Sequence, residues 1–211
     1  MTVTPGQQLA LEKIAASLST TVIGIDEVGM GCWAGPVTVA GVVVPKGWDA
    51  EGVEDSKALS PRQRKKAEGN IKAQVLSYAI FSASHEEVDR QGVGSTRDRL
   101  TEQVALQLLQ PFPDALIVQD GEVPAVIGAR PQNMVWLAKA DVLVPAVSAA
   151  SILAKVCRDE FMVAMSRLYP GYAFERNMGY GVPAHIEGLR KLGPCPIHRI
   201  SYKPVKRFLV R

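Results

Sequence analysis

The sequence has few of the side chains on which disulfide frameworks, zinc clusters and several kinds of hydrolase depend. Among its 211 residues there are three cysteines, and Cys32, Cys157 and Cys195 are too widely spaced to form a Cys-x-x-Cys pair. We therefore expect neither a disulfide framework nor a zinc knuckle, and reduced thiols indicate a cytoplasmic protein. The three histidines lie in unrelated contexts, so no Ser-His-Asp or Cys-His arrangement is predicted.

Long hydrophobic runs are also absent. No stretch reaches the roughly 18 uninterrupted apolar residues that a membrane span requires. Residues 1–18 contain no cationic region followed by a sustained apolar run. We therefore expect neither a transmembrane helix nor a signal peptide. The apolar content of 47% is ordinary for a packed core, and the length suits one globular domain with a small C-terminal appendage.

Charge is unevenly distributed along the chain, although the net charge is only +3. Residues 151–211 hold 11 Lys or Arg and 4 Asp or Glu, which gives +7, whereas residues 1–150 hold 13 and 17, which gives −4. A basic C-terminal region beside an acidic remainder is compatible with binding a phosphate backbone next to a carboxylate site. An ordinary solvated surface explains the same asymmetry equally well.

Periodicity and capping signals predict alternating strands and helices. Short β-rich apolar runs indicate strands, and capping boxes at Ser60 and Ser84 indicate helix starts. The predicted strands are residues 21–25, 37–44, 75–83, 115–119 and 133–138. The predicted helices are residues 5–18, one from Ser60, a short one from Ser84, and residues 95–110, 147–168 and 183–192. This order indicates an α/β architecture with a mixed sheet flanked by helices.

Acidic side chains come at the ends of predicted strands. Asp26 and Glu27 follow the first strand, Asp120 ends another, and Asp141 follows a third. Functional groups gather at strand ends in open α/β sheets, so these residues can converge on one site. Mg²⁺ and Mn²⁺ prefer hard oxygen ligands, and two such ions would support hydrolysis of a phosphodiester. Taken singly, an aspartate such as Asp120 or Asp141 is more often a turn residue or a helix cap than a functional group, whereas two adjacent charges after a buried strand, as at Asp26 and Glu27, are costly without a partner.

Five spaced motifs, in order over nearly the whole chain, resemble those of the type 2 ribonucleases H, the ribonuclease HII family. The first resembles the family's opening motif, the second its Asp-Ser-Lys motif, the third its long helix, and the others its C-terminal segment. The matching residues are 24–29 (GIDEVG) with Gly31 and 34–36 (AGP), 55–60 (DSKALS), 148–156 (SAASILAKV) with 158–159 (RD), 179–181 (GYG), and 193–194, 198–199 and 204–207.

The resemblance implies a ribonuclease H-like fold, with a five-stranded mixed sheet, flanking helices and a helical C-terminal extension. On this basis we expect a catalytic core over residues 1–168 and a basic, substrate-contacting segment over residues 169–211 of the same globular unit. The implied reaction is hydrolysis of the RNA phosphodiester in RNA–DNA hybrids, or at a ribonucleotide embedded in duplex DNA, which leaves a 5′-phosphate and a 3′-hydroxyl.

The resemblance also assigns roles to single residues. The family's catalytic and metal-binding acids, which would hold Mg²⁺ or Mn²⁺, fall on Asp26, Glu27, Asp120 and Asp141. The implied substrate-binding positions are Gly29, Met30, Gly31, Lys57, Ser148, Lys155 and Tyr180. Lys57 would approach a phosphate, and Tyr180 would lie against the sugar at the cleavage junction. The tripeptide 29–31 would sense a 2′-hydroxyl, largely through backbone atoms.

Several positions depart from the family's pattern, and they concern substrate contacts more than metal ligands. The usual Gly-Arg-Gly is Gly-Met-Gly here, so Met30 removes a cation that could hold phosphate. Further departures are Cys32 with Trp33, Gly92 with Val93, Glu122, Met178 and Val182. We hypothesise that metal-dependent cleavage is retained and that recognition of a single embedded ribonucleotide is weakened or changed. The alternatives are the same chemistry on another nucleic acid, and a nucleic-acid-binding relative that has lost catalysis.

Expected partners follow from the same resemblance. They are RNA–DNA hybrids or ribonucleotide-containing duplex DNA, with no membrane, and the protein is expected to be a monomer. The basic and apolar C-terminus, residues 205–211, would be either a short peptide that contacts a replication clamp or a packed end of the chain.

Overall fold

The fold is seen in a computed structural model, which describes residues 21–48, 59–121 and 133–209. The helix predicted for residues 5–18 lies outside the described residues, as do Lys57 and Glu122. In the described part, no helix is long and apolar enough to cross a membrane.

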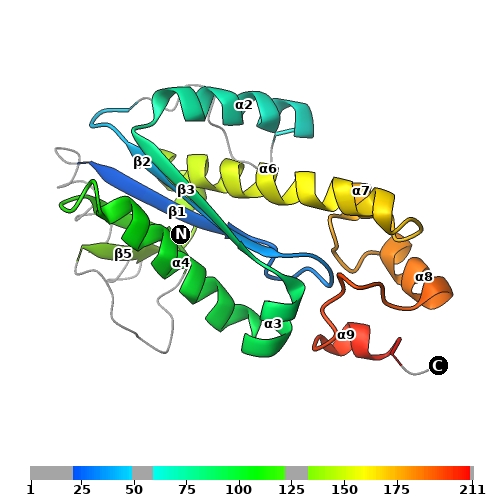
Figure 1. Ribbon diagram of the computed structural model, residues 1–211. Coiled ribbons are helices and arrows are strands. Elements are labelled where there is room, and N and C mark those ends of the chain that lie inside the picture. Colours follow the sequence, from blue (N-terminus) through cyan, green and yellow to red (C-terminus); the bar gives the residue numbers. More distant parts are fainter. Residues whose placement is uncertain (1–20, 49–58, 122–132, 210–211) are drawn as a thin grey trace, which may run out of the picture. The chain divides into compact units, whose positions relative to one another are not determined.

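Five strands form one mixed sheet flanked by helices, as predicted, in the order β3-β2-β1-β4-β5 (Figure 1). β1 pairs in parallel with β4, and β4 pairs in parallel with β5. The strands are β1 (Val22–Val28), β2 (Val37–Val44), β3 (Ser77–Ala83), β4 (Leu116–Asp120) and β5 (Met134–Leu137). The helices are α2 (Pro61–Gln74), α3 (His85–Gln91), α4 (Val93–Leu109), α5 (Ala140–Leu143), α6 (Pro145–Leu168), α7 (Phe174–Asn177), α8 (Pro183–Leu192) and α9 (Lys203–Lys206).

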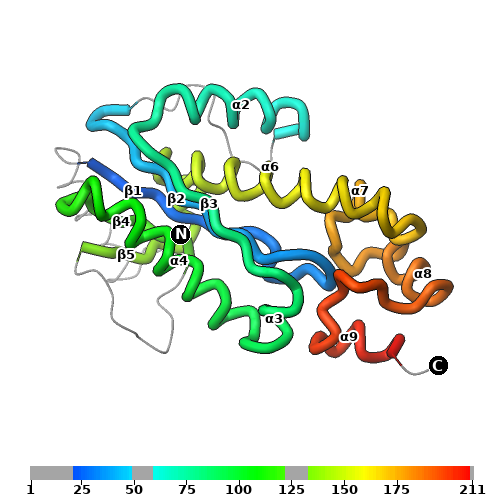
Figure 2. The backbone as a smooth tube through the Cα atoms, viewed as in Figure 1, coloured from blue at the N-terminus to red at the C-terminus, as the bar shows by residue number. Residues whose placement is uncertain are grey.

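The chain divides into two compact units, each assembled from separate segments of the sequence that can be followed along the tube in Figure 2. Unit 1 comprises residues 1–27, 39–81 and 101–156. Unit 2 comprises residues 28–38, 82–100 and 157–211. All four predicted metal-binding acids belong to unit 1.

Local sequence signals account for most of these elements. Both predicted capping boxes form: the backbone N–H of Ser60 donates to Gln63 Oε1 at 2.9 Å, and that of Ser84 donates to Glu87 Oε2 at 2.9 Å. All eight residues of β2 are buried, because this strand lies inside the sheet with a neighbour on each side.

One predicted placement needs correction. β1 continues to Val28, so Asp26 and Glu27 lie within the strand instead of after it. The fold accommodates both charges there, since Asp26 accepts from the N–H of Glu27 and Glu27 accepts from Gln119 of β4. Asp141 follows β5, which ends at Leu137, and lies in the first turn of α5, a short helix that was not predicted.

Helix α6 lies against β1 at Gly24, within unit 1. A Cβ atom at this position would overlap the backbone of Ala146 and Val147, so only glycine allows this close approach. β2 shows a similar close approach at Gly41, where a Cβ would meet Val104 and Leu108 of α4. Gly24 therefore sets how closely α6 approaches the strand that carries Asp26 and Glu27.

We predict that Gly24→Ala destabilises the protein by about 3 kcal/mol, because the new methyl group meets helix backbone that cannot rotate away. Urea unfolding of the purified variant measures this change. The matched control is Gly69→Ala in α2, where a Cβ would meet nothing within 4 Å. That change should stabilise the protein by about 0.5–1 kcal/mol. Equal effects of the two substitutions would contradict the assigned role of Gly24.

Candidate active site

Asp26 is a buried carboxylate surrounded by other acids. Its side chain is 6% exposed. Burial raises the pKa of Asp26 well above its usual value, and the negative charges of Glu27 and Asp120 raise it further. A hydrogen bond from Ser151 acts in the opposite direction and lowers this pKa. Asp26 is therefore close enough to Glu27 and Asp120 to be repelled by both, and its burial limits the screening by water.

The Asp120 carboxylate holds the turn that comes just before Asp141. The N–H of Ala140 donates to Asp120 Oδ1 at 2.7 Å. Lys139 just before it has a φ of 63°, a left-handed conformation that turns the chain into α5. Asp141, which is 5% exposed, follows in the first turn of that helix. The Asp120 carboxylate thus holds the turn that carries Asp141.

Glu27 is held by a neighbour on β4. Gln119 Nε2 donates to Glu27 Oε2 at 3.2 Å and to the carbonyl oxygen of Asp120 at 3.1 Å. In the sheet Gln119 lies opposite Ile25, two residues before Glu27, which places both side chains on one face. The carboxylate of Glu27 is therefore oriented by a neutral donor.

The first half of α6 carries two buried hydroxyl groups and a lysine. Ser148 and Ser151 are 6% and 7% exposed, and Lys155 is half-buried. Their spacing of three and four residues puts them on one side of the helix. Ser151 reaches Asp26, so this side of the helix faces the carboxylates.

The donor set suits a hard divalent cation. Within the described residues, no three His, Cys, Asp or Glu side chains form a ready-made ligand group. Glu27 accepts a hydrogen bond from Gln119 and Asp120 accepts one from the N–H of Ala140, so both carboxylates are held in their present positions. The four acids nevertheless offer only oxygen donors, and the repulsion felt by Asp26 is the cost that a bound dication would remove. Their chemistry fits Mg²⁺ or Mn²⁺.

Unit 2 holds the segment from Gly29 to Pro36 with two fully buried arginines. Arg158 and Arg199 are both 0% exposed, and their guanidinium groups donate mainly to backbone carbonyls. Arg158 donates to the carbonyls of Pro36, Met178 and Ala34 at 2.9, 2.8 and 3.0 Å. Arg199 donates to the carbonyls of Gly35, Pro36 and Met30 at 3.0, 3.0 and 3.3 Å. These bonds fix a segment that has no regular secondary structure over most of its length.

The backbone carbonyl of Met30 is fully hydrogen-bonded. Its carbonyl accepts from the Tyr202 hydroxyl at 2.9 Å in addition to Arg199, so both lone pairs are used. Gly29 has a φ of 96°, and a Cβ there would lie 2.6 Å from the Pro36 carbonyl oxygen. The backbone that is predicted to sense a 2′-hydroxyl therefore has a fixed shape.

Tyr180 lies beside this segment in unit 2. A Cβ on Gly31 would be 3.9 Å from Tyr180 Cε1, and the Tyr180 side chain is 42% exposed. Its carbonyl accepts from His185 Nδ1 at 2.9 Å, which leaves His185 Nε2 as the acceptor for His198 Nε2 at 2.9 Å. Burial is the main reason why the pKa of His198 falls to about 4, so both rings are neutral near pH 7.

The structure thus brings the predicted residues together in two groups. In unit 1, Asp26 interacts with Glu27 and Asp120, and Asp120 holds the turn with Asp141. Ser148 and Lys155 lie on the helix side that faces Asp26. In unit 2, the tripeptide 29–31 and Tyr180 are neighbours. The predicted phosphate contact at Lys57 lies outside the described residues.

Sequence reasoning missed several residues that orient the site. Ser151 lies in the matched helix motif, but nothing in the motif singles it out. Arg199 lies in the matched C-terminal segment but was assigned no role, and Tyr202 looks ordinary in the sequence. Gln119 left a clear signal, since it is a polar residue at the end of the buried apolar run 116–118 and such residues are costly without a role.

Comparison with known proteins identifies the family. The sequence profile described as Ribonuclease HII matches residues 23–205. The chain belongs to the ribonuclease HII family. Ribonuclease HII of one Thermus thermophilus strain is 43% identical over 190 residues, covering 90% of each protein. Ribonuclease HII of Lactobacillus gasseri is 42% identical over 201 residues, which cover 95% of this chain and 78% of the relative.

Solved structures agree on the fold. Ribonuclease H2 from Pyrococcus horikoshii OT3 superposes with a TM-score of 0.71 at 24% identity, covering 90% of this chain and 97% of the other. The PCNA:RNase HII complex from Archaeoglobus fulgidus contains a chain with a TM-score of 0.70 at 26% identity, with the same coverage. Membership of the ribonuclease HII family supports a type 2 ribonuclease H, a hydrolase that acts as an endonuclease on nucleic acid.

We predict that Asp26→Asn raises the melting temperature of the metal-free protein, because asparagine removes a buried charge that repels its neighbours. Each kcal/mol recovered corresponds to about 2–4 °C. Because folding raises the pKa of Asp26, ionisation of this carboxyl destabilises the folded protein once the pH exceeds about 3.9, the usual pKa of an aspartate. The difference in melting temperature between Asp26→Asn and the wild type should therefore grow from about pH 4 toward neutrality. Differential scanning calorimetry across this pH range measures it.

The matched control is Asp114→Asn, because Asp114 is an exposed aspartate of unit 1. Its melting temperature should follow the wild type at every pH. If Asp26→Asn also follows the wild type, the carboxylates do not repel one another and the description of the site is wrong.

Proposed function

We propose that this member of the ribonuclease HII family is a divalent-metal-dependent endoribonuclease of the cytoplasm. It hydrolyses the RNA phosphodiester in RNA–DNA hybrids, or at ribonucleotides embedded in duplex DNA, and leaves a 5′-phosphate and a 3′-hydroxyl. Asp26, Glu27, Asp120 and Asp141 are the proposed ligands of Mg²⁺ or Mn²⁺. The observation that carries this proposal is the packing of acids around the buried Asp26. Gln119 donates both to its neighbour Glu27 and to the Asp120 carbonyl, and the Asp120 carboxylate accepts from the turn that leads to Asp141.

The proposed mechanism divides the work between the metal and the chain. When bound, two divalent cations supply activation of the attacking water and stabilisation of the leaving oxygen. The four acids hold the ions, and they do so at positions set by β1, β4 and the turn into α5. Ser151 donates to Asp26 and keeps that carboxylate oriented. No protein side chain needs to act as a nucleophile in this scheme.

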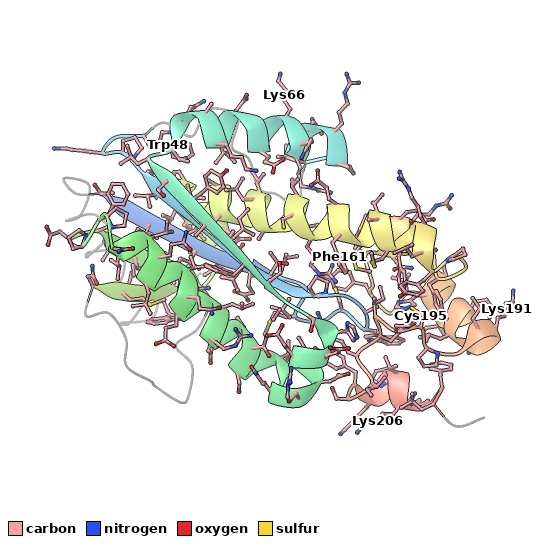
Figure 3. All side chains as sticks on the ribbon, in the orientation of Figure 1. Trp48, Lys66, Phe161, Lys191, Cys195 and Lys206 are labelled. Carbon is pink, nitrogen blue, oxygen red and sulfur yellow. The ribbon has the colours of Figure 1, made fainter. Side chains whose placement is uncertain are left out.

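Substrate recognition is proposed for unit 2 and for α6. The tripeptide 29–31 would sense the 2′-hydroxyl, Tyr180 would lie against the sugar, and Ser148 and Lys155 would contact the backbone. Exposed cations on unit 2 support phosphate binding: Lys191 on α8 and Lys206 on α9 both point away from the protein in Figure 3.

A second candidate is a changed preference among substrates, and Met30 favours it. An arginine here would offer a charged donor to a phosphate, whereas methionine offers none. The Met30 carbonyl cannot make up the loss, because it is an acceptor, like the phosphate oxygens, and it already accepts from Arg199 and Tyr202. We therefore propose that the chain cuts a continuous RNA–DNA hybrid better than a single embedded ribonucleotide.

A sliding-clamp contact is a further part of the proposal, supported by the PCNA:RNase HII complex of the Archaeoglobus fulgidus relative. Val205 is fully buried, and Phe208 packs against the core of unit 2. Leu209 is 49% exposed, and we propose it as an apolar contact for the clamp.

A cleavage assay with two substrates tests the proposed function. We expect cutting of a continuous hybrid in Mg²⁺ or Mn²⁺, none after chelation, and at least roughly a 10³-fold loss in Asp26→Asn, because several kcal/mol of charge stabilisation are removed. Met30→Arg should raise cleavage at a single ribonucleotide by about tenfold relative to the hybrid, through one charge-assisted hydrogen bond.

The control for added charge is Leu168→Arg, at an exposed position of unit 2. It should leave the ratio between the two substrates unchanged. Efficient wild-type cutting at a single ribonucleotide, with no gain from Met30→Arg, would rule out the changed preference. Binding of the hybrid without metal-dependent cutting would instead identify a relative that has lost catalysis.

A further inference from the structure

The amide of Gln119 has one possible orientation. Its nitrogen faces two oxygen acceptors, Glu27 Oε2 at 3.2 Å and the Asp120 carbonyl at 3.1 Å. Exchanging the amide oxygen and nitrogen would set an oxygen against both acceptors, with no hydrogen between them. The two N–H groups of Gln119 are therefore directed at Glu27 and at the backbone beside Asp120.

This orientation leaves the other end of the amide without a partner. Gln119 is 3% exposed, and its Oε1 is a buried side-chain oxygen with no hydrogen-bond partner among the described residues. Such an atom is costly, and an aliphatic side chain like those of Leu116, Ile117 and Val118 would avoid the cost. The glutamine therefore contributes through its nitrogen, since its oxygen lowers stability.

A neutral donor has a particular advantage beside a metal site. A lysine or arginine at this position would also hold Glu27, but its charge would compete with a metal cation for the carboxylates. The Gln119 amide fixes Glu27 Oε2 and leaves the negative charge of the cluster intact. The same hydrogen bond restricts the rotamers of Glu27 before an ion binds. Less side-chain entropy is then lost when Glu27 coordinates the ion.

From these observations we propose that Gln119 is a positioning residue for the metal site: its amide holds the Glu27 carboxylate in the orientation in which this side chain coordinates a divalent cation. The inference rests on the proposed function, because it takes Glu27 to be a metal ligand. Gln119 itself touches neither the ion nor the substrate. Its effect should therefore appear in metal affinity and not in the turnover rate at saturating metal.

Mn²⁺ binding to the full-length protein, measured by electron paramagnetic resonance of the free ion and by calorimetry, tests this role. Gln119→Met keeps the size of the side chain and removes the donor, and Gln119→Asn keeps an amide that is too short to span the same gap. We expect both variants to bind Mn²⁺ about 10–100-fold more weakly, as for other partners of metal ligands. The Mn²⁺ concentration for half-maximal cleavage should rise by the same factor, with kcat at saturating Mn²⁺ retained.

The matched control is Thr101→Val, which removes a buried polar group of unit 1 on α4. It should leave the Mn²⁺ affinity within about twofold of the wild type. Wild-type affinity in both Gln119 variants would overturn the inference and leave the proposed function standing. Absence of Mn²⁺ binding in the wild type would overturn the proposed metal site and the inference with it. A Gln119→Met protein that does not fold leaves Gln119→Asn, which preserves the polar side chain, to decide the matter.

Discussion

The contact between α6 and β1 at Gly24 is the constraint on which the candidate site depends. At this glycine the helix backbone lies directly on the strand, so the first half of α6 covers the residues that follow it on β1. The hydroxyl of Ser151 reaches Asp26 as a result, and Asp26 becomes a buried carboxylate. Burial then magnifies its repulsion with Glu27 and Asp120. A single close packing contact thus produces both the geometry and the electrostatic strain that suit a divalent cation.

Residues with local signals were predictable from the sequence. β2 was expected at residues 37–44, where it lies, and the capping boxes at Ser60 and Ser84 gave the starts of α2 and α3. Capping and strand propensity involve neighbours only a few positions apart, so a single sequence displays them. α5 left no such signal. It begins after the left-handed Lys139 and is held by Asp120, which is 20 residues away from Ala140.

The candidate site likewise contains some residues that have a signal in the sequence and others that have none. The four acids are proposed from the sequence, partly because they come near strand ends and mainly because the motifs resemble a known family. The groups that orient them or shape the neighbouring loop are not. Gln119 and Glu27 are 92 residues apart, and Tyr202 is 172 residues from Met30. Such hydrogen bonds exist only after the chain has folded. The only sign of them in the sequence is a polar residue within an apolar run, as at Gln119.

Anomalous X-ray scattering from crystals grown with Mn²⁺ would show whether the carboxylates on β1, β4 and α5 form a divalent-metal site. We expect anomalous peaks between Asp26, Glu27, Asp120 and Asp141, with oxygen atoms as the ligands. The Gln119 amide should still donate to Glu27 in the same crystals. Full Mn²⁺ loading with peaks elsewhere, and none at these four residues, would show that these carboxylates are not the metal site.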